Sequence, residues 1–213
     1  MKHSFIASGM MASGIGLLLA GAAFAQETPK FAFNVGGGFT EPVGRTGENL
    51  NTGWNIGAGA GYNFTSYVGA LVQFNDTQSD ISRGTLNTIG FPGGNVNVWS
   101  LTLNPIVHTH PRGPADLYFI GGGGLYHWRQ QFTAPGVAAV TGFDPFFGFF
   151  QTAVPTTDVL SSYSVNKPGV NGGVGLSFGT KWNVKFYTEA RYHRIIFGDR
   201  HADMLPVTFG IRW

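Results

Sequence analysis

The last ten residues, 204–213, alternate strictly between two kinds of side chain. Apolar side chains occupy every second position and alternate with Pro, Thr, Gly and Arg: Leu205, Val207, Phe209, Ile211 and Trp213. An extended strand of this sequence has one wholly apolar face. In water it would form an exposed edge, which soluble proteins protect with charge or cover. A closed sheet surrounded by lipid has no such edge, so the pattern predicts the closing strand of a transmembrane β-barrel.

The same alternation recurs in seven segments upstream of this strand. They are 31–40, 53–64, 67–75, 96–107, 117–129, 170–178 and 184–193. In the first of them Phe31, Val35 and Phe39 share one face, whereas Asn, Gly and Thr occupy the other. With the C-terminal strand the count is eight, and bacterial barrels have an even number of strands. The predicted fold is all-β: an eight-stranded antiparallel up-and-down transmembrane β-barrel.

The connections between these strands alternate between long and short. The long ones are 41–52, 76–95, 130–169 and 194–203, and the short ones are 65–66, 108–116 and 179–183. Outer-membrane barrels have short periplasmic turns and longer extracellular loops. We therefore expect both ends of the barrel domain on the periplasmic side and all four long loops outside the cell.

The N-terminus has the three parts of a secretory signal peptide. Lys2 and His3 precede an apolar stretch, which ends at Ala23-Phe24-Ala25. An A-x-A sequence is a typical cleavage site. We expect residues 1–25 to be removed, which leaves a barrel domain of residues 26–213 exported to the bacterial outer membrane.

Charge and composition exclude several other classes of protein. Without Lys2, 13 − 1 = 12 basic residues face 11 acidic ones, and only 11% of the chain is charged, against about a quarter in soluble domains. No basic patch predicts a nucleic-acid partner. The chain has no cysteine, which excludes disulfides and thiolate metal sites. After residue 25 no apolar run reaches the ~18 residues of a membrane helix.

Four motifs resemble those of the small eight-stranded outer-membrane barrels, the OmpA-type transmembrane domain and its relatives. They are V-W-S-L-T-L-N-P at 98–105, Y-F-I-G-G-G-G-L-Y at 118–126, F-Y-T-E-A-R-Y-H at 186–193 and V-T-F-G-I-R-W at 207–213. The resemblance implies that Phe209, Ile211 and Trp213 form the signal read by the barrel-assembly machinery. It also implies outer-membrane lipid and lipopolysaccharide as the surroundings, and we expect a monomer.

Charged side chains gather on the face of the strands that we expect to line the lumen. By alternation they are Lys185, Glu189, Arg191 and His193 on the seventh strand, His127 and Arg129 on the fifth, and Arg212 on the eighth. An eight-stranded barrel has an interior just wide enough for side chains to fill it. We therefore predict a lumen salt-bridge network and a structural or surface-interaction role. The alternative is a narrow channel for small or hydrophobic solutes. In that case the lumen charges would form a gated pore or a proton relay.

Catalytic, cofactor and metal sites are not predicted. A lipid A acyl hydrolase would need a serine near its histidine, but Arg194 and Ile195 follow His193, which faces the lumen by alternation. His108 and His110 lie on a short turn, where a solvated turn is favoured over a metal site. A soluble periplasmic barrel of lipocalin type is a further alternative, but it would need its Trp and Tyr side chains inward.

The third long loop contains an unusual apolar cluster. Its phenylalanines surround a Pro and a Gly: Phe143, Phe146, Phe147, Phe149 and Phe150. One hypothesis is contact with lipid, lipopolysaccharide or a hydrophobic ligand at the outer rim. The other is that these rings pack on each other, capping the barrel mouth or extending the fifth and sixth strands beyond the membrane.

Overall fold

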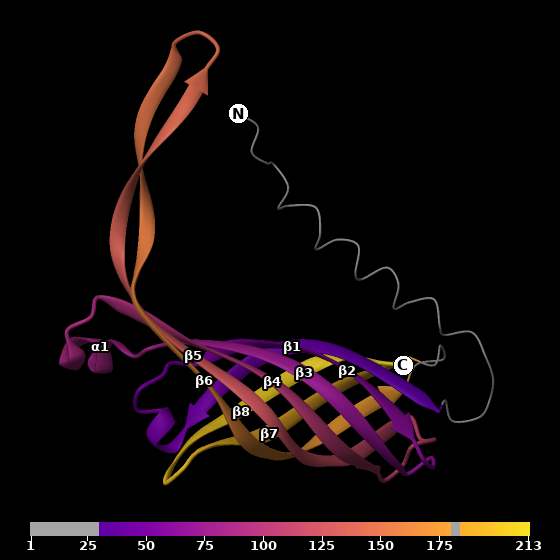
Figure 1. The fold of residues 1–213 in the computed structure, drawn as a ribbon. Helices are drawn as coiled ribbons and strands as arrows, with labels where there is room; N and C mark the ends of the chain where they lie inside the picture. Colours follow the sequence, from indigo (N-terminus) through magenta and orange to yellow (C-terminus); the bar gives the residue numbers. More distant parts are fainter. Residues whose placement is uncertain (1–29, 180–183) are drawn as a thin grey trace.

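Eight antiparallel strands form one closed barrel in the computed structural model of the chain, which describes residues 30–179 and 184–213 (Figure 1). The predicted signal peptide lies outside the described residues. Each strand pairs with its sequence neighbours, and β8 also pairs with β1. The strands are β1 (Phe31–Val43), β2 (Gly53–Asn63), β3 (Val68–Asp80), β4 (Gly93–His108), β5 (Ala115–Asp144), β6 (Gly148–Gly179), β7 (Lys185–Phe197) and β8 (Arg200–Arg212).

The C-terminal strand closes the ring, as its sequence predicts. Val35 pairs with Ile211 in the β1–β8 ladder. Beyond the end of β8, Phe33 N donates to Trp213 O at 2.8 Å and Trp213 N donates to Phe33 O at 3.0 Å. The two rings stack with their centroids 6.1 Å apart. The predicted eight-stranded transmembrane barrel is therefore confirmed. We call the end that holds Trp213 the C-terminal end and the opposite one the hairpin end.

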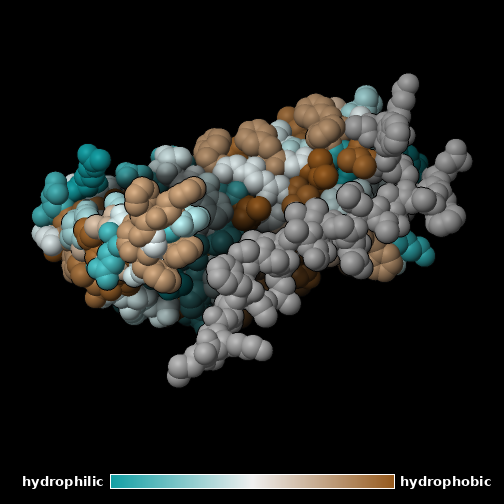
Figure 2. Space-filling view, turned by 90° about the horizontal axis from the view of Figure 1, so that it is seen from above, coloured by the Kyte–Doolittle hydropathy of each residue, from teal (hydrophilic) through white to brown (hydrophobic). Residues whose placement is uncertain are grey.

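The outer wall of the barrel is an apolar belt. Large hydrophobic side chains such as Phe31, Ile56, Leu103, Val174 and Phe209 are exposed on it. Figure 2 shows such side chains, in brown, along the wall. No outward position between Phe31 and Phe39, or between Trp99 and Val107, carries a charge. This surface suits hydrocarbon, where charged side chains are destabilising.

The fifth strand is the one whose faces the sequence pattern assigns wrongly. Tyr118 and Tyr126 are buried and point into the lumen, whereas we expected them on the outer face. His127 instead stacks outside on Trp99, with ring centroids 5.0 Å apart, and Arg129 is exposed. The predicted lumen network therefore loses these two members.

The glycines of the neighbouring strand explain this reversal. A Cβ at Gly175 of β6 would clash with the Tyr118 ring, and one at Gly169 would clash with the Tyr126 ring. The missing side chains leave room inside the barrel for two large tyrosines. The alternation of β5 alone does not reveal this space, because the glycines that leave it lie on β6.

Several strands run further than their alternation predicts. β3 and β4 reach into the segment 76–95, where only helix α1 (Arg83–Ile89) and short links remain. Between β1 and β2 lies a 3-10 helix, η1 (Gly44–Thr46). Only residues 198–199 separate β7 from β8, where 194–203 was the expected loop. In residues 30–179 and 184–213, helices are too short or too polar to cross a membrane.

The largest difference concerns residues 130–169, expected as a loop but almost entirely strand. β5 continues to Asp144 and β6 begins at Gly148, and their pairing runs to the Asp144↔Gly148 pair with one register shift at Phe132/Thr133. Figure 1 shows this pair as a twisted ribbon that rises from the barrel wall. Both of its faces are solvent-exposed, so no apolar–polar contrast marks the strands in the sequence.

A charge in the middle of the apolar belt tests the orientation of the wall. Leu103→Lys should lower the free energy of unfolding by about 2–4 kcal/mol, the cost of a lysine at the bilayer midplane. The control is Val137→Lys on the exposed ribbon, which should change it by less than ~0.5 kcal/mol. Urea unfolding in lipid vesicles measures both; equal losses would contradict a lipid-facing Leu103.

Candidate functional site: the barrel lumen and the ribbon tip

Three of the four lumen side chains predicted on β7 lie in the middle of the lumen. Glu189, Arg191 and His193 are all buried, because alternate residues of β7 point inward. Arg191, only 2% exposed, forms an ion pair with Glu189 and donates to Gln73 Oε1 at 2.9 Å. Tyr118 OH donates to the second carboxylate oxygen of Glu189 at 3.0 Å. One acid thus joins β5 and β7 across the lumen.

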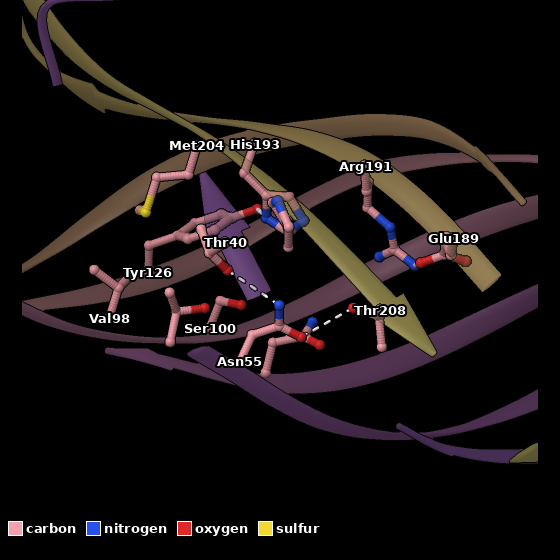
Figure 3. Close-up of a pocket in the computed structure, with 13 residues that line it drawn as sticks. Thr40, Asn55, Val98, Ser100, Tyr126, Glu189, Arg191, His193, Met204 and Thr208 are labelled. Atoms are coloured by element: carbon pink, nitrogen blue, oxygen red, sulfur yellow. Dashed lines mark hydrogen bonds and ion pairs between the residues drawn. The ribbon is translucent and has the colours of Figure 1, made fainter. Parts of the chain in front are cut away.

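A small polar cavity lies beside this ion pair (Figure 3). Tyr126 OH and His193 Nδ1, 2.9 Å apart, form a hydrogen bond on one side of it. Opposite them, Asn55 donates to Thr40 Oγ1 at 3.1 Å and accepts from Thr208 Oγ1 at 3.0 Å. The space open to the centres of water molecules is ≈ 20 Å³, which suffices for about one water. The cavity is too small for an organic solute.

A second buried pair lies at the C-terminal end of the lumen and was not predicted from sequence. Asp116 Oδ2 lies 2.5 Å from His108 Nδ1, and Asp116 Oδ1 accepts from the His110 backbone N–H at 2.8 Å. We expected His108 and His110 on a solvated turn. Alternation did not reveal the pair, because Asp116 shares the face of Tyr118, which the sequence pattern placed outward.

Two further cations face the same end of the lumen. Lys185 and Arg212 are paired across the β7–β8 ladder. Lys185 Nζ donates to Pro111 O at 2.8 Å. The Arg212 guanidinium is buried, with the Tyr118 and Tyr187 ring centroids 4.6 Å and 5.2 Å away. This end of the barrel is therefore rich in hydrogen-bond donors.

The hairpin end of the lumen differs because it holds a cluster of buried apolar side chains. The buried cluster comprises Leu50, Ile81, Leu86, Val96, Val98, Tyr126, Ile195, Ala202 and Met204. Leu86 comes from α1 and Leu50 from the link between η1 and β2, so segments outside the wall contribute to it. Phe91, Trp128, Phe132 and Phe197 pack against it. We call this cluster the apolar plug.

The phenylalanines of the expected loop lie at the tip of the ribbon. Phe146 and Phe147 form its turn and are 90% and 86% exposed. Asp144 Oδ1 accepts from both of their backbone N–H groups, at 2.8 and 3.1 Å. Phe143 and Phe149 contact each other across the ribbon, with ring centroids 5.1 Å apart. The rings thus pack in part on each other but do not cap the barrel mouth.

In residues 30–179 and 184–213, no cluster of three or more His, Cys, Asp or Glu side chains is placed to hold a metal ion. His110, the second histidine of the turn, has its ring beside Thr109 Oγ1 at 3.2 Å. The functional candidates are therefore the polar lumen and the ribbon tip.

A family comparison agrees with this architecture. The family described as outer membrane protein beta-barrel domain matches residues 13–212. The match covers most of the chain, so the chain belongs to this family of bacterial outer-membrane proteins. No curated protein sequence matches it.

Solved structures show the same fold at low sequence identity. Neisserial surface protein A is 14% identical with a TM-score of 0.56, over 86% of this chain and 96% of that one. A major outer membrane protein from Thermus thermophilus is 11% identical with a TM-score of 0.55, over 86% and 97% of the two chains. At these identities the likeness concerns the fold alone.

Removal of the shared lumen acid tests the central ion pair. Glu189→Gln leaves the buried Arg191 without its carboxylate, so the free energy of unfolding in lipid vesicles should fall by about 3–5 kcal/mol. Glu189→Gln combined with Arg191→Met should recover part of this loss, because no unpaired charge remains. Thr188→Val on the outer face is the control and should have little effect. An equal loss in the single and double variants would contradict the pairing.

Proposed function

We propose that this protein is a non-catalytic outer-membrane barrel with a closed lumen that contacts hydrophobic surfaces outside the cell through the tip of its ribbon. The observation that carries the proposal is the exposed phenylalanine tip at the end of a long β5–β6 ribbon. From Thr133 to Asp144 the ribbon has 12 residues, about 40 Å of extended chain. The tip can therefore reach well beyond the membrane surface.

The chemistry of the tip favours apolar partners. Burying a phenylalanine side chain is worth about 1.5–3 kcal/mol, and Phe146, Phe147 and Phe149 are almost fully available for it. The Asp144 carboxylate is already bound to the backbone of the turn. These bonds to Oδ1 offset part of the cost of desolvating the carboxylate. Lipid, lipopolysaccharide acyl chains and apolar protein patches are surfaces that would bury the phenylalanine rings.

The edges of the ribbon support contact through the tip rather than through strand pairing. Pro135 lies in the β5 part of the ribbon and Pro155 in the β6 part. Proline lacks the N–H that an added strand would need, and proteins use it to protect exposed edges. A partner that extends the sheet is therefore disfavoured, and the side chains of the tip remain the available surface.

The lumen contents favour a closed barrel over a channel. The apolar plug occupies the hairpin end, the Glu189–Arg191 pair lies in the middle, and the cavity beside the pair has room for about one water. An acyl hydrolase is not supported either, because His193 faces the lumen and bonds to Tyr126 rather than to a serine.

Export and orientation complete the proposal. Residues 1–25 would direct secretion, and the barrel-assembly machinery would recognise Phe209, Ile211 and Trp213 at the C-terminal end. That end, with its short turns, would face the periplasm. The ribbon and α1 would then face outward, and the protein would act as a monomer in outer-membrane lipid and lipopolysaccharide.

Planar-bilayer recordings test the closed lumen. The refolded wild-type protein should give no steady open state, because side chains fill the interior. An open porin inserted under the same conditions controls for incorporation. Stable conductance steps from the wild-type barrel would favour the channel instead.

Substitution at the tip tests the surface contact. Replacing Phe146, Phe147 and Phe149 by Ser should lower the partition of expressing cells into hexadecane at least several-fold, since the exposed apolar area is lost. The matched control replaces Val137, Val140 and Val154 by Ser, which changes three exposed apolar residues in the stem of the ribbon and should retain most of the partition. Surface labelling must show equal amounts of both variants. Equal partition of both variants would refute a role specific to the tip.

A further inference from the structure

We propose that Arg212 and Lys185 form a binding site for a small inorganic anion inside the C-terminal end of the lumen. This site is independent of the ribbon tip and of the proposed surface contact. It rests on the burial of Arg212, on the lack of an acceptor for its guanidinium, and on the charges around it.

The Arg212 side chain is buried and has no hydrogen-bond partner in the described part of the chain. It is 7% exposed, and its Nε, Nη1 and Nη2 atoms meet no acceptor in residues 30–179 and 184–213. The rings of Tyr118 and Tyr187 lie close to its guanidinium. Aromatic rings interact with the flat face of a guanidinium, whereas its five N–H donors lie in the plane. The tyrosines therefore leave the donors of Arg212 unused.

Neither acid of the lumen is available to Arg212. The Asp116 oxygens bond to the His108 ring and to the His110 backbone N–H. The Glu189 oxygens bond to Arg191 and Tyr118. No ion pair links Arg212 to any carboxylate in residues 30–179 and 184–213.

The side-chain charges that face this end of the lumen do not cancel. Lys185 and Arg212 contribute two positive charges and Asp116 contributes one negative charge, so 2 − 1 leaves one positive charge, whereas Glu189 and Arg191 neutralise each other. Arginine does not deprotonate in proteins. A buried cation without a counter-charge is costly, and a bound anion would remove this cost.

The neighbours of Arg212 offer further donors. Lys185 stands opposite Arg212 in the β7–β8 register and uses one of its three N–H groups on Pro111 O. The Ser177 hydroxyl is buried without a partner, at a β6 position that pairs with Tyr187 and with Asp116. Asn34 of β1, which pairs with Arg212 in the β1–β8 ladder, is also buried and has both its Nδ2 and its Oδ1 without a partner, so it adds one donor group and one acceptor. Among the described residues, donors still exceed free acceptors here, which selects an anion over a cation. As the last strand residue of β8, Arg212 also lies close to the C-terminal mouth of the barrel.

A bromide soak tests the site directly. Crystals of the refolded full barrel in sodium bromide should give an anomalous peak in contact with the Arg212 guanidinium. A peak there establishes the site, whereas a guanidinium surrounded only by water, with no anomalous signal, overturns the proposal.

Solution measurements separate a specific site from a general salt effect. At constant ionic strength, exchanging gluconate for bromide should raise the thermal unfolding midpoint of the wild-type protein, because a ligand that binds only the folded state stabilises it. Arg129→Gln removes an arginine from the outer face and should keep the full rise. Arg212→Gln should abolish it.

Milder variants keep the proposal testable if Arg212→Gln does not fold. Lys185→Gln and Ser177→Ala leave Arg212 in place and should each reduce the bromide-dependent rise at least two-fold. A rise of the same size in wild type, Lys185→Gln and Ser177→Ala would show a non-specific effect and overturn the site.

Discussion

Closure of the backbone ladder is the constraint on which the rest of this structure depends. In hydrocarbon each unsatisfied N–H or C=O costs several kcal/mol, so the first and last strands must find each other. They do so through the β1–β8 ladder and the Phe33–Trp213 pair beyond it. Closure also fixes which face of every strand meets lipid. It explains why residues far apart in the chain, such as Asp116 and Lys185, face one narrow interior.

That interior is divided by chemistry along the barrel axis. Buried apolar side chains cluster at the hairpin end, an acid shared by Tyr118 and Arg191 lies in the middle, and donors predominate at the C-terminal end. Glycines such as Gly175 and Gly169 make space for the tyrosines that bring these layers together. Small residues on one strand thus make room for large ones on the next.

The ribbon of β5 and β6 is the part of the sheet that extends beyond the closed barrel and does not need to close on itself. Beyond the barrel its edges meet water, which satisfies the backbone groups that lipid cannot. A two-stranded hairpin alone is only marginally stable, so its continuity with the barrel wall holds it in place. The exposed rings of Phe146 and Phe147 then lie at the end of the ribbon, away from the barrel wall (Figure 1).

The sequence by itself determined the strand number, the closing strand and the outward face of most strands, because lipid imposes an apolar–polar alternation that is visible along one chain. It also indicated that Glu189, Arg191, His193 and Arg212 point inward. The tertiary structure alone decided the phase of β5, since the space for its tyrosines comes from glycines on β6. It likewise decided the Asp116–His108 pair and the length of the ribbon, because pairing across strands and exposure on both faces leave no periodic signal in the sequence.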